Sequence, residues 1–537
     1  MIRAPRVVAS IIAFSAVVGL AARARADITL AAAQNESGWE VYTFGRAGVF
    51  VSVLKGDGIP QAYGPQYRDP ITGVVTLDGS GNPIQATDMN GRPLFAAIHG
   101  VGDGGVRAGP SDPYLAPDGQ SGQGPIFASR VRSGFMGNIF GLGVKRALTP
   151  WTRLDVVFSI WGTTETEGRR TFYKNTPDWR ESYIRVEGPL GTLVLGRALS
   201  LFSRGAVEID FLYGHNYGVG NPADFDGRGP TAGHIGYGVI APVFVGGVTY
   251  ATPKFHGLQL TVGYFDPATT VGIYWGRTKF GRPEGELAYD VAAPNFRLHL
   301  FASGAWQRLY SLSLAVDANG NSIDERPQAD VLGGAGGARV EVGRFHLGVA
   351  GHRGRGIGVG YFLDGSDANF AKDTTHELRT FTGAYAQAQV GAGKFDFNAG
   401  WGVTWIDALE ADKNSNWCGL VPDPTMPDKV CAGYTKATGV VLPASSILKS
   451  QMGWSAVVVY HATPNIHIAA DYFLSNVKWQ QGEQQIVHSY NLGTTGLPGD
   501  RRLVGAAATR AVPKCLEGMD SRRHWAALRK KETNLKK

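Results

Sequence analysis

The stretch Tyr250–Phe265, YATPKFHGLQLTVGYF, carries the pattern that decides the fold. Leu258, Leu260 and Val262 fall on one face of an extended chain. The polar residues that alternate with them, beginning at Gln259, fall on the other face. Such a strand contacts water on one side only. In a soluble sandwich its apolar face points into a core, whereas in a closed membrane barrel that face points to lipid.

Sixteen segments repeat this alternation, and their connections are alternately short turns and long polar loops. Short turns on one rim and long loops on the other are typical of a transmembrane barrel, which needs an even number of strands. The sequence therefore predicts an all-β fold, a transmembrane antiparallel β-barrel of about sixteen strands. The predicted strands are 39–54, 127–147, 151–163, 180–188, 191–199, 234–251, 255–266, 284–293, 295–311, 329–342, 344–356, 376–391, 393–408, 447–461, 464–478 and 485–495.

The N-terminus has the pattern of a secretory signal peptide. Arg3 and Arg6 precede an apolar run from Val7 to Ala22, and small residues flank a cleavage point before Asp27. The apolar run is shorter than the ~20 residues that a membrane-spanning helix needs. The sequence predicts a signal peptide over residues 1–26, export, and a location in the outer membrane.

We expect one barrel domain over residues 39–495, preceded by a mature N-terminal leader at 27–38. Within it, residues 55–126 form an unusually long first loop, rich in Gly, Pro and Asp. Residues 200–233 form the long third loop. No linker divides this domain.

The formal net charge of +7 comes from the two ends of the chain. Residues 1–26 contain four Arg and no acid, and residues 496–537 contain eleven Lys or Arg against four Asp or Glu. Residues 27–495 contain 37 basic and 41 acidic residues. Because this body is slightly acidic, the charge does not indicate a nucleic-acid partner.

Residues 496–537 form a basic tail in which the strand period is lost. One interpretation is a genuine tail that is attracted to anionic lipid or cell-wall polymer. The other is a shift of reading frame that replaced the natural end of the last strand, and we favour it. It predicts that the tail packs on nothing and that the last strand is short where it meets the first.

Two cysteines, Cys418 and Cys431, lie in one loop rich in Pro and Asp. In an oxidising compartment they could close a small loop disulfide. The twelve residues between them, with no His nearby, do not fit a metal site, and the sequence predicts neither a metal nor a cofactor. We find no catalytic motif and expect no enzyme activity.

Several segments resemble the Gram-negative general porins, a family of trimeric, sixteen-stranded barrels. The matching segments are SRVRSGFMG at 129–137, ESYIRVEGPLGTLVLGR at 181–197, LYGHNYGVG at 212–220 and the hairpin quoted first. The resemblance covers residues 39–495. It implies a homotrimer in outer-membrane lipid, and a third loop that folds into the lumen and narrows the pore.

A porin sorts solutes through opposite charges that face each other across its narrowest point. We expect the acidic side to come from the third loop and the basic side from wall strands. Arg130 and Arg132 have the parity of inward positions and are the first candidates. The predicted constriction residues are Arg130, Arg132, Arg153, Arg185, Arg197, Glu208, Asp210, Asp224 and Asp226.

The sequence thus predicts a water-filled channel for passive diffusion of small hydrophilic solutes and ions. A sugar-selective or anion-selective porin is the nearest alternative. A secreted β-rich glycan-binding protein or adhesin is a more distant one. The face that carries Leu258, Leu260 and Val262 distinguishes the barrel from the secreted protein, because that face meets lipid in one and a protein core in the other.

Overall fold

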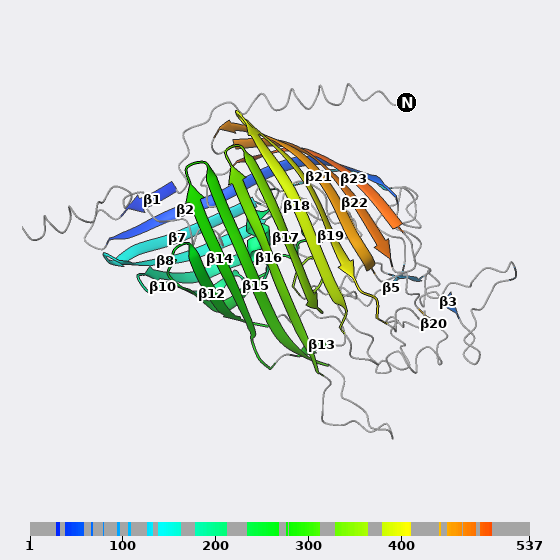
Figure 1. Cartoon of the computed structure of the whole chain (residues 1–537), viewed down its shortest axis with the longest axis horizontal. Coiled ribbons are helices and arrows are strands. Elements are labelled where there is room, and N and C mark those ends of the chain that lie inside the picture. The colour runs from blue at the N-terminus through cyan, green and yellow to red at the C-terminus, as the bar shows by residue number, and fades with distance from the viewer. Residues whose placement is uncertain are drawn as a thin grey trace, which may run out of the picture. The chain divides into compact units, whose positions relative to one another are not determined.

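A computed structural model of the chain describes sixteen wall strands and their neighbouring segments (Figure 1). The described residues are 28–32, 38–57, 66–67, 79, 94–96, 106–108, 126–132, 138–162, 178–211, 234–267, 275–277, 279–311, 328–362, 378–409, 440–441, 448–463, 466–479 and 484–496. Several predictions lie outside these residues: the signal peptide, most of the first loop, Asp224, Asp226, Cys418, Cys431 and the basic tail.

The wall is one antiparallel sheet that closes on itself, because the first and last strands pair. Of the nineteen strands in this sheet, β6 and β7 pair in succession with one edge of β2, and β1 and β13 are short additions. Sixteen strands therefore form the barrel, as predicted. They are β2 (Trp39–Gly56), β6 (Ile126–Arg132) with β7 (Asn138–Thr149), β8 (Thr152–Gly162), β9 (Asp178–Gly188), β10 (Gly191–Leu199), β11 (Phe244–Ala251), β12 (Leu258–Phe265), β14 (Arg282–Ala293), β15 (Phe296–Ser311), β16 (Gln328–Val342), β17 (Phe345–Arg355), β18 (Thr380–Ala392), β19 (Phe395–Ile406), β21 (Leu448–Thr463), β22 (Ile466–Trp479) and β23 (Gln484–Gly496).

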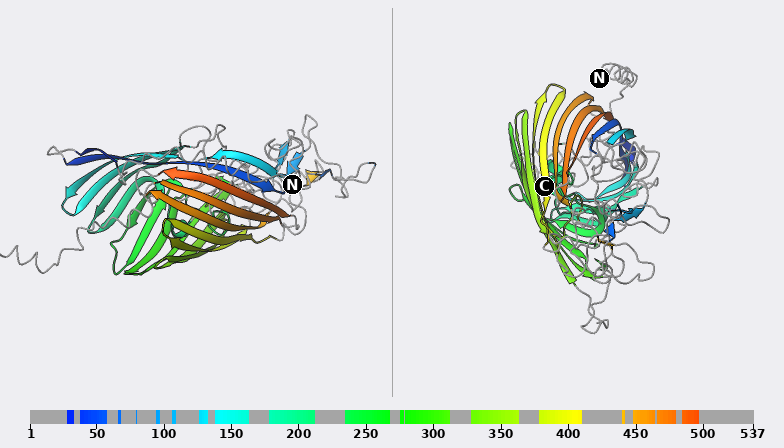
Figure 2. Two further views of the ribbon diagram at one scale, coloured as in Figure 1. Left: turned by 90° about the horizontal axis from the view of Figure 1, so that it is seen from above. Right: turned by 90° about the vertical axis from the view of Figure 1, so that its right-hand side faces the viewer.

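Figure 2 shows how the wall curves, with the green to orange strands on one side and the blue and cyan strands on the other. Two predicted strand boundaries are wrong. The predicted strand 127–147 is divided into β6 and β7. The predicted strand 234–251 begins only at Phe244, because residues 234–243 form turns and isolated bridges that pack against other strands.

The two faces of the wall have opposite chemistry. On β12 the side chain of Leu260 is 45% exposed, whereas its neighbours Gln259 and Thr261 are 8% and 7% exposed. Leu258 and Val262 share the exposed face. A soluble sandwich would bury these apolar side chains, but here the polar side chains are buried instead. The exposed face is the outer face of the barrel and the buried face is its inner face.

Glycines with positive φ occupy short turns between wall strands. Gly343 has φ 56° between β16 and β17, and Gly393 has φ 63° between β18 and β19. Residues with a Cβ atom rarely adopt a positive φ, whereas glycine does so without steric strain, so glycine suits these tight turns. The turns bring the strands back in register, which keeps one parity inward throughout the wall.

The barrel closes where β2 meets two separate segments. The end of β23 at Gly496 lies opposite Ala47. Further along the same edge of β2, β1 (Ile28–Ala32) pairs with residues Glu40 to Thr43. Both β23 and β1 run antiparallel to β2, so β1 continues the line of the last strand. The N-terminal segment thus covers an edge that β23 does not reach.

The described parts of the first loop and of residues 409–446 contain two small sheets. Residues of β3 (Gln66–Tyr67) pair with β20 (Val440–Val441). In the other sheet, β4 (Leu94–Ala96) pairs with β5 (Val106–Ala108). Within the part of the chain that the structure describes, no helix is long and apolar enough to cross a membrane.

The assignment of the apolar face to lipid leads to a prediction about stability when a charge is introduced at Val262, near the middle of β12. Because this side chain is exposed on the apolar face, Val262→Arg should lower the free energy of unfolding in lipid by about 2–4 kcal/mol. Val262→Ala, which keeps the position apolar, should cost less than about 1 kcal/mol. Urea unfolding in lipid vesicles measures both, and equal losses would contradict the assignment of this face to lipid.

Candidate functional site

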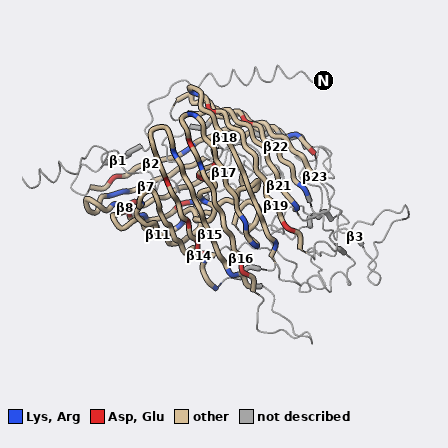
Figure 3. The backbone as a smooth tube through the Cα atoms, in the orientation of Figure 1, with Lys and Arg blue, Asp and Glu red and all other residues tan. Residues whose placement is uncertain are grey.

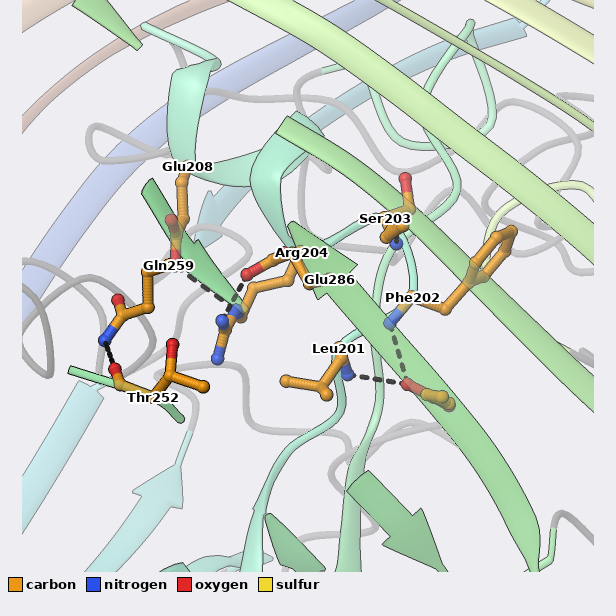
Figure 4. A network of polar contacts seen from close by, with 10 residues as sticks. Leu201, Phe202, Ser203, Arg204, Glu208, Thr252, Gln259 and Glu286 are labelled. Carbon is orange, nitrogen blue, oxygen red and sulfur yellow. Dashed lines mark hydrogen bonds and ion pairs between the residues drawn. The ribbon is translucent and has the colours of Figure 1, made fainter. Parts of the chain in front are cut away.

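The segment between β10 and β11 is attached to the inner face of the wall, and its described parts are residues 200–211 and 234–243. It contains the one-and-a-half-turn helix α2 (Arg204–Ile209), which lies against β15, β16 and β17. Figure 4 shows the polar contacts at the start of this segment. We call these two described parts the inner segment.

A single carboxylate holds the start of the inner segment. Glu284, on the inner face of β14, accepts hydrogen bonds from the backbone N–H groups of Leu201 at 2.6 Å and Phe202 at 2.7 Å. It also accepts one from Nε of Arg282 at 2.6 Å. All of these groups are buried. Hydrogen bonds to a charged acceptor contribute about 1.5–3 kcal/mol each, so Glu284 is a strong anchor.

The next contact is an ion-pair cluster around Arg204, the first residue of α2. Its Nη2 donates to Glu286 of β14, and its Nε lies 3.6 Å from Oε1 of Glu208, one turn further along the helix (Figure 4). Burial raises the pKa of Glu208 to about 7, against the opposing effect of the Arg204 charge. Arg204 therefore pairs with both carboxylates in a place that excludes most water.

The end of α2 is fixed to β18. The hydroxyl of Tyr385 donates to the Ala206 carbonyl at 2.6 Å. The amide of Gln387 donates to the Ile209 carbonyl at 2.8 Å and accepts from the N–H of Phe211 at 3.1 Å. These bonds satisfy backbone groups that a helix end leaves without partners inside the helix.

His234 begins the second described part and connects it to α2 and the wall. Its Nδ1 lies 3.2 Å from Asp210 Oδ2, and its ring stacks on Tyr385 with centroids 5.2 Å apart. Three residues later, the hydroxyl of Tyr237 lies 2.7 Å from Oγ of Ser475 on β22. The inner segment thus reaches from β14 to β22.

The inner segment lies very close to the wall at a glycine of β19. A Cβ at Gly402 of β19 would lie 1.9 Å from the Tyr237 carbonyl oxygen. Any side chain at this position would push the inner segment away from the wall.

Of the set predicted by sequence, the described structure includes Glu208, beside Arg204, and Asp210, beside His234. Both lie on the inner segment, but the basic partner of Glu208 is Arg204 of the same helix. The wall opposite carries Glu284 and Glu286. Charges of both signs lie on each side at this point, because the segment carries Arg204 with Glu208 and the wall carries Arg282 with Glu284.

Three predicted wall arginines lie apart from this cluster. Arg185 pairs with Asp155 at 2.5 Å on the inner face. Arg153 is exposed beside a short turn, opposite Glu187. Arg197 is exposed at a position of the same parity as the outward Leu195.

Arg130 and Arg132 occupy inner-face register positions on β6. They lie opposite Ser52 and Phe50, which are both buried on β2. The structure describes the backbone at these two positions and not their side chains.

Sequence reasoning missed Arg204, Arg282, Glu284, Glu286 and His234. The alternation in β14 contained a signal, because Arg282, Glu284 and Glu286 occupy every second position and so share the inner face. Charged residues are sparse along the wall (Figure 3), so three charged residues on one face of a single strand indicate a functional position. No group of three or more His, Cys, Asp or Glu suited to a metal ion occurs among the described residues.

Residues 96–493 match the family model of the Gram-negative porins. Among solved structures, the chain is similar to the outer membrane channel DcaP of Acinetobacter baumannii, with 11% identity, a TM-score of 0.52, and coverage of 87% of this chain and 100% of that one. It is also similar to the anion-selective porin from Comamonas acidovorans, with 11% identity, a TM-score of 0.46, and coverage of 86% and 99%. No curated protein matches the chain.

The buried Glu208 predicts that stability depends on pH. Its pKa lies above the ordinary value of 4.5, at about 7, so the folded chain holds this proton more tightly than the unfolded chain. The free energy of unfolding should therefore fall as pH rises from 4.5 to 7.

We expect Glu208→Gln to remove this loss, which is up to about 3 kcal/mol. Urea unfolding at several pH values measures it, with Glu187→Gln at the rim as a control that keeps the wild-type profile. Identical profiles for wild type and Glu208→Gln would contradict the prediction.

Proposed function

The chain belongs to the Gram-negative porin family, and on that premise we propose how its channel is narrowed and charged. The protein is an outer-membrane channel for passive diffusion. We propose that the inner segment narrows this channel, that the N-terminal 26 residues direct export, and that the solutes are small and hydrophilic.

One observation carries the proposal of a narrowing. The inner segment contacts inner-face residues on strands from β14 to β22, including Glu284, Gln387 and Ser475. A segment held at both described parts on the inner face occupies space that would otherwise be open lumen. The hydrogen bonds that Glu284 accepts from Leu201 and Phe202 fix the position of the inner segment.

We propose that Arg204, Glu208 and Glu286 give this part of the channel its local charge. The side chains of Arg204 and Glu208 are 13% and 17% exposed, so water reaches part of each. Partly buried charges act more strongly on a passing ion than exposed ones, because screening is weaker. Solutes of either sign would meet a close pair of opposite charges here.

We also propose a homotrimer. The resemblance to trimeric porins supports this state, and the apolar outer face offers surface for contact between subunits. Chemical crosslinking in mild detergent should give a trimer band, and a product that stops at the monomer would contradict it.

Planar-bilayer recordings test the function and the narrowing together. The purified protein should give stepwise current, since only an open aqueous pore does so. Glu284→Ala removes the acceptor of Leu201 N–H and Phe202 N–H, and should increase the single-channel conductance by releasing the segment.

The matched control is Glu181→Ala. Glu181 is also a buried inner-face carboxylate, and its Oε2 accepts a hydrogen bond from Ser159 of the wall strand β8 at 2.6 Å. If both variants raise the conductance equally, the effect comes from loss of lumen charge and not from loss of the hydrogen bonds between Glu284 and the inner segment. Absence of stepwise current from the wild type would contradict the channel itself.

The wall positions Arg130 and Arg132 give a separate test of ion selectivity. We propose that they add positive charge to the lumen, because their register partners Ser52 and Phe50 are buried on the inner face. The double variant Arg130→Ala with Arg132→Ala should shift the reversal potential under a salt gradient toward cation selectivity. An unchanged reversal potential would exclude these residues from the permeation path.

A further inference from the structure

Inner-face residues of ten neighbouring wall strands form one continuous row of register partners. Each member lies directly opposite the next across the sheet. All but Val457 are polar. The row, which we call the polar row, runs Arg297, Glu341, His346, Gln389, Asn398, Val457, Asp471, Asn491, Ser52 and Arg130.

The polar row connects the two ends of the barrel. Arg297 is the second residue of β15, beside a short turn. Ser52 lies near the end of β2 that leads into the long first loop. Because barrel strands are tilted, a row that crosses them at right angles climbs along the barrel axis. A solute that follows this row moves from one rim toward the other.

The charges at the start of the row, Arg297 and Glu341, lie beside each other, and His346 lies beside a neutral amide. Arg297 Nη1 lies 3.6 Å from Oε2 of Glu341, and Nδ1 of His346 lies 3.3 Å from Oε1 of Gln389. Asp471 is different. Its described polar contact is Asn491, whose Nδ2 donates to Oδ1 at 2.7 Å, and no described basic side chain forms an ion pair with it.

Three oxygens near the middle of the row have no hydrogen-bond partner among the described residues. They are Oδ2 of Asp471, Oδ1 of Asn491 and Oδ1 of Asn398. The residues are 8%, 4% and 6% exposed, respectively. All three atoms are acceptors. Water can satisfy an amide oxygen, but it does not balance a buried carboxylate, which is costly without a positive partner.

The surroundings of Asp471 include an apolar patch on the same inner face. Phe50, Val457, Val459 and Ala469 form a buried cluster. Phe50 extends across Gly493, where an added Cβ would meet its ring at 2.2 Å. A carboxylate beside an apolar patch fits a solute that has a donor-bearing positive end and a hydrocarbon body.

We propose that Asp471, with Asn491 beside it and Asn398 two strands away, forms a binding step in the channel for small solutes whose carbon chain ends in an amino or guanidino cation. An ammonium offers three donors and a guanidinium five, which suits the three acceptor oxygens that have no described partner. The apolar patch contacts the carbon chain of the solute. This inference rests on the proposed channel function, because the step lies on the inner face of the barrel.

Planar bilayers test this step with a pair of solutes of nearly equal shape. L-Arginine carries the guanidinium, and L-citrulline replaces it with a neutral ureido group. Added to one side at constant ionic strength, arginine should reduce the potassium chloride current at a concentration about tenfold lower than citrulline. Losing one charge-assisted hydrogen bond has an effect of this size.

Asp471→Asn keeps the shape of the side chain and the acceptor for Asn491 but removes the charge. It should raise the half-blocking concentration of arginine to that of citrulline, whereas Asp471→Glu should retain most of the difference. Asp471→Ser is a second neutral variant if Asp471→Asn does not insert into the membrane.

The matched control is Asp396→Asn. Asp396 is an inner-face carboxylate of β19 that already pairs with His461 at 2.8 Å, so the block by arginine should stay within about twofold of wild type. Equal effects of Asp396→Asn and Asp471→Asn, or equal block by arginine and citrulline in the wild type, would overturn the inference. Stepwise current without any block by arginine would overturn it while leaving the channel function intact, whereas no current would contradict the channel.

Discussion

Pairing of every backbone hydrogen-bonding group is the constraint on which this structure depends. In hydrocarbon an unpaired N–H or C=O costs several kcal/mol, so a sheet in a membrane must close on itself. Here closure requires that β2 pair on both edges, with β6 and β7 on one side and β23 and β1 on the other. The last strand covers only part of that edge, and the N-terminal strand covers a further part. Closure therefore depends on residues from the start of the chain as well as from its end.

Closure of the sheet also determines where the polar side chains lie. Each wall strand places one parity toward lipid and the other toward the lumen, so buried carboxylates such as Glu284 and Asp155 can occur inside a membrane protein. They are stabilised by partners that other strands or the inner segment supply. The Glu284 carboxylate accepts hydrogen bonds from two backbone N–H groups and from Nε of Arg282 at once, which links the position of the inner segment to the wall.

The charges around the inner segment are mixed in sign. Arg204 lies on the inner segment and its main carboxylate partner, Glu286, lies on the wall. Further around the barrel, Asp471 lies on the wall with an amide partner only among the described side chains. A cation and an anion passing through this lumen would thus meet different side chains.

The sequence by itself determined the barrel, the number of its strands and the face that each presents, because a period of two along a strand is a local property. It also gave Glu208 and Asp210 as acids of the segment between β10 and β11. It missed the contribution of Arg204 and Glu284, and it assigned strand structure to residues 234–243. Contacts between Glu284 and Leu201, or between His234 and Tyr385, join residues that are 83 and 151 positions apart in the chain. Only the register of the closed sheet decided these contacts and the order of the polar row, because cross-strand partners depend on how far each strand slides against the next, and no local pattern encodes that shift.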